Sequence, residues 1–320
     1  MKNILIVGAG NIGKRHIQSI LKEKKFNYNI HVIDKSNYSI KKIFNEITEI
    51  KKSKKIRIEN NFKNLNKEYD LIIIATTSFK REDIITLLLK KTIFKNLILE
   101  KIVFQNISSY KHFIKIFKSK KINCWVNCPN RFYKSYNDLK KLIVKNCPLS
   151  MVVSGGNWHF GSNFVHYTDL FCYLINTNDL TIDQFEFESE IVKSKRKNFV
   201  EFNGLVSLKN NKGNFLTIIH NNTRPNVNIK IIQKNLSFIF NENDNFALIN
   251  RKKNNFSKID FKIPFQSELT KLYCKEIFLN KRINLPTLEN HYKINKNIFD
   301  KISNFYYKIK RKNKGFIPIT

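Results

Sequence analysis

The sequence has no apolar run that approaches the ~20 residues that a membrane-spanning helix needs. Its first apolar segment, residues 3–7, is short and ends at a glycine, whereas a signal peptide continues into a longer apolar stretch and a small-residue cleavage site. Both absences argue against a membrane span and an export signal. We therefore expect a soluble, cytoplasmic protein.

Cysteine is scarce in the sequence. The five cysteines form an odd set, contain no CxxC pair and occur in a chain without an export signal. They are Cys124, Cys128, Cys147, Cys172 and Cys274. Neither a disulfide framework nor a zinc site is indicated, and we expect no metal.

Acidic residues are few, since 25 Asp and Glu stand against 58 Lys and Arg and the formal net charge is +33. Clustered positive charge of this size would indicate nucleic acid as a partner, because Lys and Arg neutralise phosphates. Here the lysines are dispersed among abundant Asn, Ile and Phe, as an AT-rich coding bias would produce. We expect no specific nucleic-acid partner, although dispersed positive potential can steer an anionic small substrate.

The first part of the chain alternates short apolar runs with helical patterns. The expected strands are 3–7, 31–34, 70–75, 97–99 and 122–126, and the expected helices are 11–24, 37–51, 81–91 and 107–119. Strands and helices that alternate at this spacing give a parallel sheet with right-handed crossovers. The pattern predicts an α/β fold that begins with a doubly wound Rossmann domain over residues 1–124.

A different rhythm follows residue 150, and the chain is long enough for a second domain with its own core. Strand-like runs separated by turn residues predict a large, mostly antiparallel sheet. These runs are 185–192, 200–208, 214–221, 227–233 and 236–240, and helices are expected at 266–280 and 289–310. We expect residues 125–320 to form a substrate-binding α/β domain, with a late helix packed on its sheet or returned to the first domain. An open sheet face predicts a homodimer or homotetramer.

A glycine motif, Gly8-Ala9-Gly10-Asn11-Ile12-Gly13, joins the first strand to the first helix. Such glycines allow a tight turn, close approach of the backbone to a pyrophosphate, and close helix packing. Asp34 ends the next strand 21 residues after Gly13. The pattern predicts that a dinucleotide is bound by Gly8, Gly10, Asn11, Ile12, Gly13 and Asp34. The alternative interpretation, a tight turn without a ligand, would have to account for the three glycines and the acid together.

Asp34 also bears on which dinucleotide is bound. Its carboxylate can accept hydrogen bonds from the ribose 2′-hydroxyl and would repel a 2′-phosphate. This favours NAD, while Lys35 and Ser36 leave NADP open.

Two more strands end in polar residues at the same edge of the predicted sheet. Thr76 and Thr77 follow the strand 70–75, and Glu100 and Lys101 follow the strand 97–99. Ligands of open α/β sheets bind at the carboxyl ends of the strands. We predict that these four residues contact the cofactor, against the alternatives of a plain turn and a solvated loop.

These residues resemble the Gfo/Idh/MocA oxidoreductases, whose mark at the position of Glu100-Lys101 is Glu-Lys-Pro. The segment 125–132 is similar to the family's Asn-x-x-Arg-Phe segment at the domain junction, and 166–170 contains its His-x-x-Asp pattern. The resemblance implies a Rossmann domain, a second α/β domain with an open sheet, and hydride transfer between NAD(P) and a sugar or polyol carbon.

The resemblance also implies roles for single residues. Lys101 would bind and polarise the reacting oxygen, and His166 would assist proton movement, with Asp169 orienting it or capping structure. Arg131 would contact an anion or the cofactor amide. The candidate substrate contacts are Asn127, Ser162, Asn163 and His166, while Trp158 and His159 are a second tier that could line a sugar site.

Further segments resemble a sub-branch associated with bacterial surface-polysaccharide and sugar-nucleotide clusters. They are Glu-Lys-Ile-Val-Phe-Gln at 100–105, Trp-Val-Asn-Cys-Pro at 125–129, and residues 155–158, 162–166, 285–287 and 318–320. This association implies a nucleotide-linked or otherwise modified sugar as the substrate.

Three departures from the family pattern qualify this interpretation. Ile102 replaces the proline of Glu-Lys-Pro. After the second Thr, Ser78 replaces a proline and Arg81 replaces a histidine. Ser162 replaces the usual acid four residues before His166. Serine cannot serve as a carboxylate base. Two alternatives therefore stay open: an epimerase or lyase that recycles NAD, and a catalytically impaired NAD-binding regulator.

Overall fold

The computed structural model describes residues 1–320 except 25, 49, 51–54, 224, 252–254 and 312–314. The chain divides into two compact units that interleave along the sequence. The first comprises Met1–Phe104, Ser109–Asn127 and Pro264–Leu288, and the second comprises Gln105–Ser108, Cys128–Ile263 and Glu289–Thr320. The sequence led us to expect a single cut at residue 124. No helix of the described residues combines the length and the hydropathy needed to cross a membrane.

The first unit contains a six-stranded parallel sheet in the order β3-β2-β1-β5-β7-β8. Its strands are β1 (Lys2–Val7), β2 (Tyr28–Ile33), β3 (Ile56–Glu59), β5 (Leu71–Ile74), β7 (Asn96–Leu99) and β8 (Asn123–Val126), and β4 (Glu68–Tyr69) pairs with β6 (Ile93–Phe94). Ile4 lies opposite Leu71 in the register of the two central strands, and both side chains are fully buried. Such continuous apolar runs suit strands covered on both faces.

Helices connect these strands, as the sequence predicts. They are α1 (Asn11–Leu21), α2 (Asn37–Glu46), α4 (Arg81–Lys91) and α5 (Ile107–Ser119). The helix expected over 37–51 therefore ends earlier as α2, and residues 49 and 51 of that expectation lie outside the described residues. The edge strand β3 was not predicted, because its half-exposed residues alternate apolar with charged types and form no continuous apolar run.

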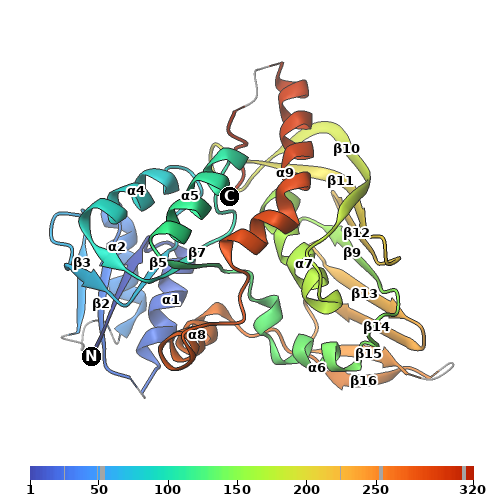
Figure 1. Cartoon of the computed structure of the whole chain (residues 1–320), viewed down its shortest axis with the longest axis horizontal. Helices are drawn as coiled ribbons and strands as arrows, with labels where there is room; N and C mark the ends of the chain where they lie inside the picture. The colour runs from blue at the N-terminus through green and yellow to red at the C-terminus, as the bar shows by residue number, and fades with distance from the viewer. Residues whose placement is uncertain (25, 49, 51–54, 224, 252–254, 312–314) are drawn as a thin grey trace. The chain divides into compact units, whose positions relative to one another are not determined.

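Helix α8 (Gln266–Asn280) returns from late in the chain to the first unit, where it packs on α1 (Figure 1). His16 Nδ1 and Thr270 Oγ1 lie 2.8 Å apart, and the amide of Lys271 donates to Ser19 Oγ at 2.9 Å. Of the two positions that the sequence left open for the late helices, α8 thus takes the return to the first domain. Helix α9 (Leu288–Lys310) lies almost wholly in the second unit.

The second unit contains an eight-stranded sheet in the order β10-β11-β12-β9-β13-β14-β15-β16. Strands β9 and β12 pair in parallel, and the other pairs recorded in this sheet are antiparallel. The strands are β9 (Ser150–Gly156), β10 (Thr181–Lys193), β11 (Val200–Lys209), β12 (Phe215–Asn221), β13 (Asn228–Gln233), β14 (Leu236–Asn241), β15 (Phe246–Asn250) and β16 (Ser257–Asp260). The helices are η1 (Pro129–Phe132), α6 (Lys134–Leu142), α7 (Phe160–Ile175) and α9. The predicted fold class is confirmed.

Burial alternates along the strands of this second sheet. In β13, Ile229 and Ile231 are fully buried, whereas Lys230 and Ile232 are exposed. An alternation of period two is typical of a sheet that is covered on one face and open on the other. The buried face supports α7, whose residues Phe160 and Phe164 stack at 5.5 Å between ring centroids.

A buried hydrogen-bond network centres on Glu100 in the first unit. Its Oε1 lies 3.0 Å from His16 Nε2 and accepts a hydrogen bond from the Asn127 amide. The hydroxyl of Tyr273 in turn donates to Asn127 Oδ1 at 3.2 Å. Burial alone would raise the pKa of Glu100, but the bonds from His16 and Asn127 and the charge of Lys101 hold that pKa below its ordinary value. The network ties α1 and α8 to the ends of β7 and β8.

Replacing Glu100 with alanine should destabilise the protein, because it leaves two buried polar side chains without their acceptor. We expect Glu100→Ala to lower the free energy of unfolding by about 3 kcal/mol in urea denaturation. The exposed Glu68→Ala is the control and should change it by less than about 0.5 kcal/mol.

The same network makes this stability difference depend on pH. A carboxyl whose pKa is lowered in the folded state stabilises the protein above its unfolded pKa and loses that contribution as the pH falls through the lowered value. The difference between wild type and Glu100→Ala should therefore shrink below the ordinary glutamate pKa of 4.5. A difference that grows on acidification would contradict this account of the network.

Candidate functional site

The glycine turn after β1 brings its predicted residues together in the first unit. Gly8 has φ +102°, a left-handed conformation that favours glycine, and its amide donates to Ile33 O at 2.8 Å. A Cβ on Gly13 would lie only 1.8 Å from Gly8 O, so helix α1 starts in direct contact with the turn. The amide of Ala9 donates to Asp34 Oδ2 at 2.6 Å. The motif and the acid that ends β2 thus form one structure.

The turn fits a dinucleotide phosphate. A Cβ on Gly10 would meet no atom within 4 Å, so open space lies against the backbone at this point. Gly10 is the N-cap of α1, no side chain caps the helix, and its first turn holds no acidic residue. The first amides of a helix have no acceptor within the helix and favour an anion. Asn11, Ile12 and Gly13 are therefore placed to receive a pyrophosphate.

Asp34 is held at the end of β2 by two main-chain amides. Besides Ala9, the amide of Ser36 donates to its Oδ1 at 2.8 Å. Ser36 is also the N-cap of α2 and accepts from the amide of Ser39 at 3.2 Å. The carboxylate thus has a fixed position beside the glycine turn, which suits an acceptor for ribose hydroxyls.

Thr76 and Thr77 follow β5 after a single residue, Ala75. The hydroxyl oxygen of Thr76 is buried, and none of the described residues forms a hydrogen bond with it. Thr77 is exposed. A buried hydroxyl that lacks a protein partner is a candidate contact for a bound group, as the sequence predicts for the cofactor.

The buried Arg81 fixes the backbone around Lys101. Its guanidinium donates to four main-chain oxygens, at 2.5 Å to that of Glu100 and 2.9 Å to that of Val103. The four acceptors belong to Thr76, Glu100, Ile102 and Val103. The side chain therefore joins the end of β5 to the segment after β7, in which the Lys101–Ile102 peptide is cis. Sequence reasoning noted Arg81 only as a departure and missed this role, since no local pattern reports where a buried guanidinium finds acceptors.

Three predicted ligand contacts have protein partners instead. The side chains of Glu100 and Asn127 lie in the buried network of the first unit. In the second unit, Arg131 Nε donates to Asp169 Oδ2 at 2.8 Å, and a second guanidinium nitrogen donates to Oδ1. Asp169 is fully buried, and burial raises its pKa to about 6 although Arg131 opposes the shift. Asp169 thus pairs with Arg131 and joins η1 to α7, and the roles predicted for these residues at a ligand stay predictions.

His166 and Asn163 line one pocket of the second unit, with a volume of about 210 Å³. They lie three residues apart on α7 and hence on one face of the helix. The Asn163 amide donates to Trp158 O, and Trp158 also lines the pocket. Ser162 does not line it, because its hydroxyl donates to the buried Glu201 of β11. Lys101 belongs to the first unit, so each half of the predicted reaction centre is described within its own unit.

Glu242 lines the same pocket and was not predicted. It follows β14 in a turn of Asn and Asp residues, a composition that indicates only a surface turn. The Tyr167 hydroxyl donates to Glu242 Oε1 at 3.0 Å. Burial raises the pKa of Glu242 to about 7, against the opposing effect of that hydrogen bond. A carboxyl that is partly protonated at neutral pH thus accompanies His166.

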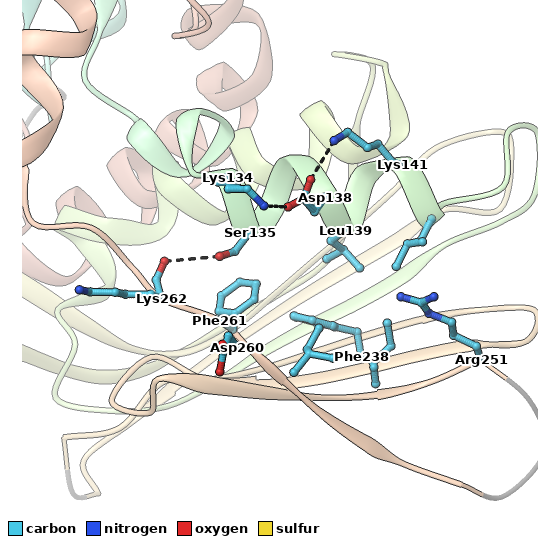
Figure 2. A pocket seen from close by; sticks show the side chains of 13 residues that line it. Lys134, Ser135, Asp138, Leu139, Lys141, Phe238, Arg251, Asp260, Phe261 and Lys262 are labelled. Carbon is cyan, nitrogen blue, oxygen red and sulfur yellow. Dashed lines mark hydrogen bonds and ion pairs between the residues drawn. The ribbon is translucent and has the colours of Figure 1, made fainter.

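A larger cavity of about 510 Å³ lies between α6 and strands β14–β16 and contains none of the predicted residues (Figure 2). Its floor is apolar, and basic side chains including Arg251 and Lys262 stand around it. Asp138 neutralises two of the basic groups, at 2.5 Å to Lys134 and 2.8 Å to Lys141. Volume alone thus does not identify the reaction site.

Two glycine substitutions separate cofactor binding from folding. Gly10→Ala adds a methyl group to the open space where a pyrophosphate would lie, and we expect it to weaken NADH binding at least about tenfold, or 1.4 kcal/mol, with an unchanged melting temperature. Gly13→Ala places its methyl group on Gly8 O and should lower the melting temperature itself. Calorimetric titration and thermal unfolding measure both effects. Unchanged NADH binding by folded Gly10→Ala would remove the cofactor from this turn.

Comparison with known proteins agrees with this geometry. Residues 2–128 match the family model of Gfo/Idh/MocA proteins, described as an oxidoreductase family with an NAD-binding Rossmann fold. No curated protein sequence matches the chain.

Solved structures share the fold of nearly the whole chain. A dehydrogenase (MviM) from Clostridium difficile is 16% identical, with a TM-score of 0.72 over 95% of this chain and 99% of that one. UDP-N-acetylglucosamine 3-dehydrogenase GnnA from Acidithiobacillus ferrooxidans is 11% identical, with a TM-score of 0.68 over 94% and 96% of the two chains. A biliverdin reductase from Synechocystis, in complex with biliverdin and NADP⁺, is 13% identical, with a TM-score of 0.70 over 93% and 98%. Residues 2–128 thus form an NAD(P)-binding Rossmann domain that is similar to that of the Gfo/Idh/MocA oxidoreductases.

Proposed function

We propose that the protein transfers a hydride between NAD(P) and a carbon of a sugar or nucleotide sugar, in the biosynthesis of a bacterial surface polysaccharide in the cytoplasm. The observation that carries this proposal is the pocket in which His166 stands beside Asn163 and Glu242. Such a set of polar groups suits a hydroxylated ligand. The fold does not decide the substrate, since similar structures include an enzyme named for a nucleotide sugar and one named for biliverdin.

Different residues of the chain have different roles in such a reaction. The glycine turn and Asp34 hold the cofactor, which when bound supplies the hydride chemistry at its nicotinamide. Lys101, fixed by the bonds of Arg81 to its neighbours, binds the reacting oxygen. His166 moves the proton of that oxygen, in the protonation state that the direction of reaction requires.

The two alternatives use the same residues differently. An epimerase or lyase would recycle the cofactor in each turnover and give no net change in absorbance near 340 nm. A regulator without catalysis is suggested by Ser162, whose hydroxyl binds Glu201 and cannot act as a carboxylate. The presence of Lys101, of His166 and of the Glu242 carboxyl in the pocket of His166 favours the enzyme.

We also propose that the open face of the second sheet forms a homodimer or homotetramer. Ile232 is 41% exposed on β13, and an apolar side chain on an uncovered sheet face gains by burial against a second copy. Light scattering should give the mass of two or four chains, and Ile232→Lys should shift the equilibrium toward the monomer. A monodisperse wild-type monomer would overturn this proposal.

Hydride transfer can be tested with UDP-N-acetylglucosamine and a panel of other nucleotide sugars, using protein stripped of copurified cofactor. We expect NAD⁺-dependent absorbance at 340 nm with one of these probes, and Lys101→Met should lower kcat about 100-fold or more while NADH still binds. Lys111→Met, an exposed lysine on α5, is the matched control and should leave the rate unchanged. Equal losses in both variants would count against a role for Lys101 at the reacting oxygen.

A further inference from the structure

The carboxyl group of Glu242 stands in the pocket of His166, and the reaction outlined above does not use it. Its position comes from the turn that follows β14. The amide of Glu242 donates to Val227 O at 3.0 Å, and the Asn241 side chain donates to Asn228 Oδ1 at 2.9 Å. The backbone beneath the carboxyl is therefore anchored on the neighbouring strand, although the residue lies in a turn.

The carboxyl itself is oriented by helix α7. Tyr167 donates to one of its oxygens at 3.0 Å, and Tyr167 is the neighbour of His166 in the sequence. Both side chains line the pocket together with Glu242. A hydrogen bond to a single oxygen leaves the other oxygen of the carboxyl for a ligand.

The groups that face Glu242 are hydroxyls and one imidazole. They are Tyr133 after η1, Tyr136 on α6, and His166 and Tyr167 on α7. Within the part of the chain that the structure describes, no lysine or arginine forms an ion pair with Glu242. Burial without a cation is the reason that its pKa rises to about 7. The group can thus both accept and release a proton near neutral pH.

The family pattern expects an acid four residues before the histidine, and this chain has Ser162 there. The side chain of Ser162 binds Glu201 and does not line the pocket. A carboxyl from a different element, the β14–β15 turn, is present instead. The pocket therefore contains a carboxyl even though the usual position lacks one.

We propose that Glu242 is the proton acceptor of this pocket, an inference that rests on the proposed hydride transfer. When a sugar carbon is oxidised, its C–H hydrogen leaves with two electrons as hydride to the nicotinamide. As the C=O bond forms, His166 takes up the O–H proton and passes it to the Glu242 carboxylate in the same pocket, which then releases that proton to solvent. In the reductive direction the same carboxyl supplies the proton that His166 delivers to the oxygen.

The first test uses the pH profile of turnover with NAD⁺ and the nucleotide sugar that wild type accepts. Glu242→Gln keeps the shape of the side chain and cannot titrate, so we expect kcat to fall about 100-fold and the ascending limb near pH 7 to disappear. Glu242→Asp should restore part of the rate. Asp244→Asn, an exposed acid of the same turn, should behave as wild type. A Glu242→Gln enzyme with the wild-type pH profile overturns the proposal.

A second variant guards against a merely structural effect of Glu242→Gln. Tyr167→Phe removes only the hydrogen bond that stabilises the carboxylate, so it should move the ascending limb of the pH profile of kcat to higher pH. An unmoved limb in the folded variant overturns the proposal.

Carbon NMR of protein labelled at the glutamate carboxyls separates this proposal from the proposed function. We expect one resonance with a midpoint near pH 7 that is absent from Glu242→Gln. A Glu242 midpoint near 4.5 overturns the proposal even where hydride transfer is intact. If the resonance titrates near pH 7 but no probe is oxidised, the proposed function is rejected. The catalytic role of Glu242 is then rejected with it, although the titration of Glu242 near pH 7 is established.

Discussion

Helix α1 begins so close to the end of strand β1 that no side chain fits between them. A Cβ on Gly13 would lie 1.8 Å from Gly8 O, and Gly8 itself adopts a left-handed conformation. This contact directs the free amides of the helix to the carboxyl edge of the sheet, where Gly10 leaves open space. The carboxylate of Asp34 accepts a hydrogen bond from the Ala9 amide and thereby joins the end of β2 to this turn. Cofactor binding thus follows from a packing constraint that only glycine satisfies.

Buried charges hold the neighbouring loops in place. Arg81 donates to main-chain oxygens on both sides of Lys101, and Glu100 is hydrogen-bonded to His16 and Asn127. A buried charge that loses its partners is costly, so the segment after β7 has little freedom to move. The pair of Arg131 and Asp169 does the same for η1 and α7 in the second unit. Glu100, Asn127 and Arg131, which the sequence predicted to contact ligands, thus hold neighbouring segments of the chain in position.

Local patterns predicted five strands of each large sheet, because continuous apolar runs and alternating burial depend on nearest neighbours in the chain, but they did not predict β3, β9, β15 or β16. The glycine turn and Asp34 were predictable for the same reason. The return of α8 to α1 was left open, since the bond between Lys271 and Ser19 joins residues that are far apart in the sequence. Glu242 could not be found, because its approach to Tyr167 depends on the register of β14 and nothing in its turn marks it. Roles for Lys101 and His166 still rest on resemblance.

The most direct test of the account is to follow the transferred hydrogen itself. NADH in which both hydrogens at C4 of the nicotinamide are deuterium would be incubated with the protein and an oxidised nucleotide sugar, and the product would be analysed by mass spectrometry. The account predicts that the sugar gains one deuterium at the carbon that is reduced. A product formed without deuterium, or cofactor bound with no transfer to any sugar of the panel, would contradict the proposal that this chain is a sugar oxidoreductase.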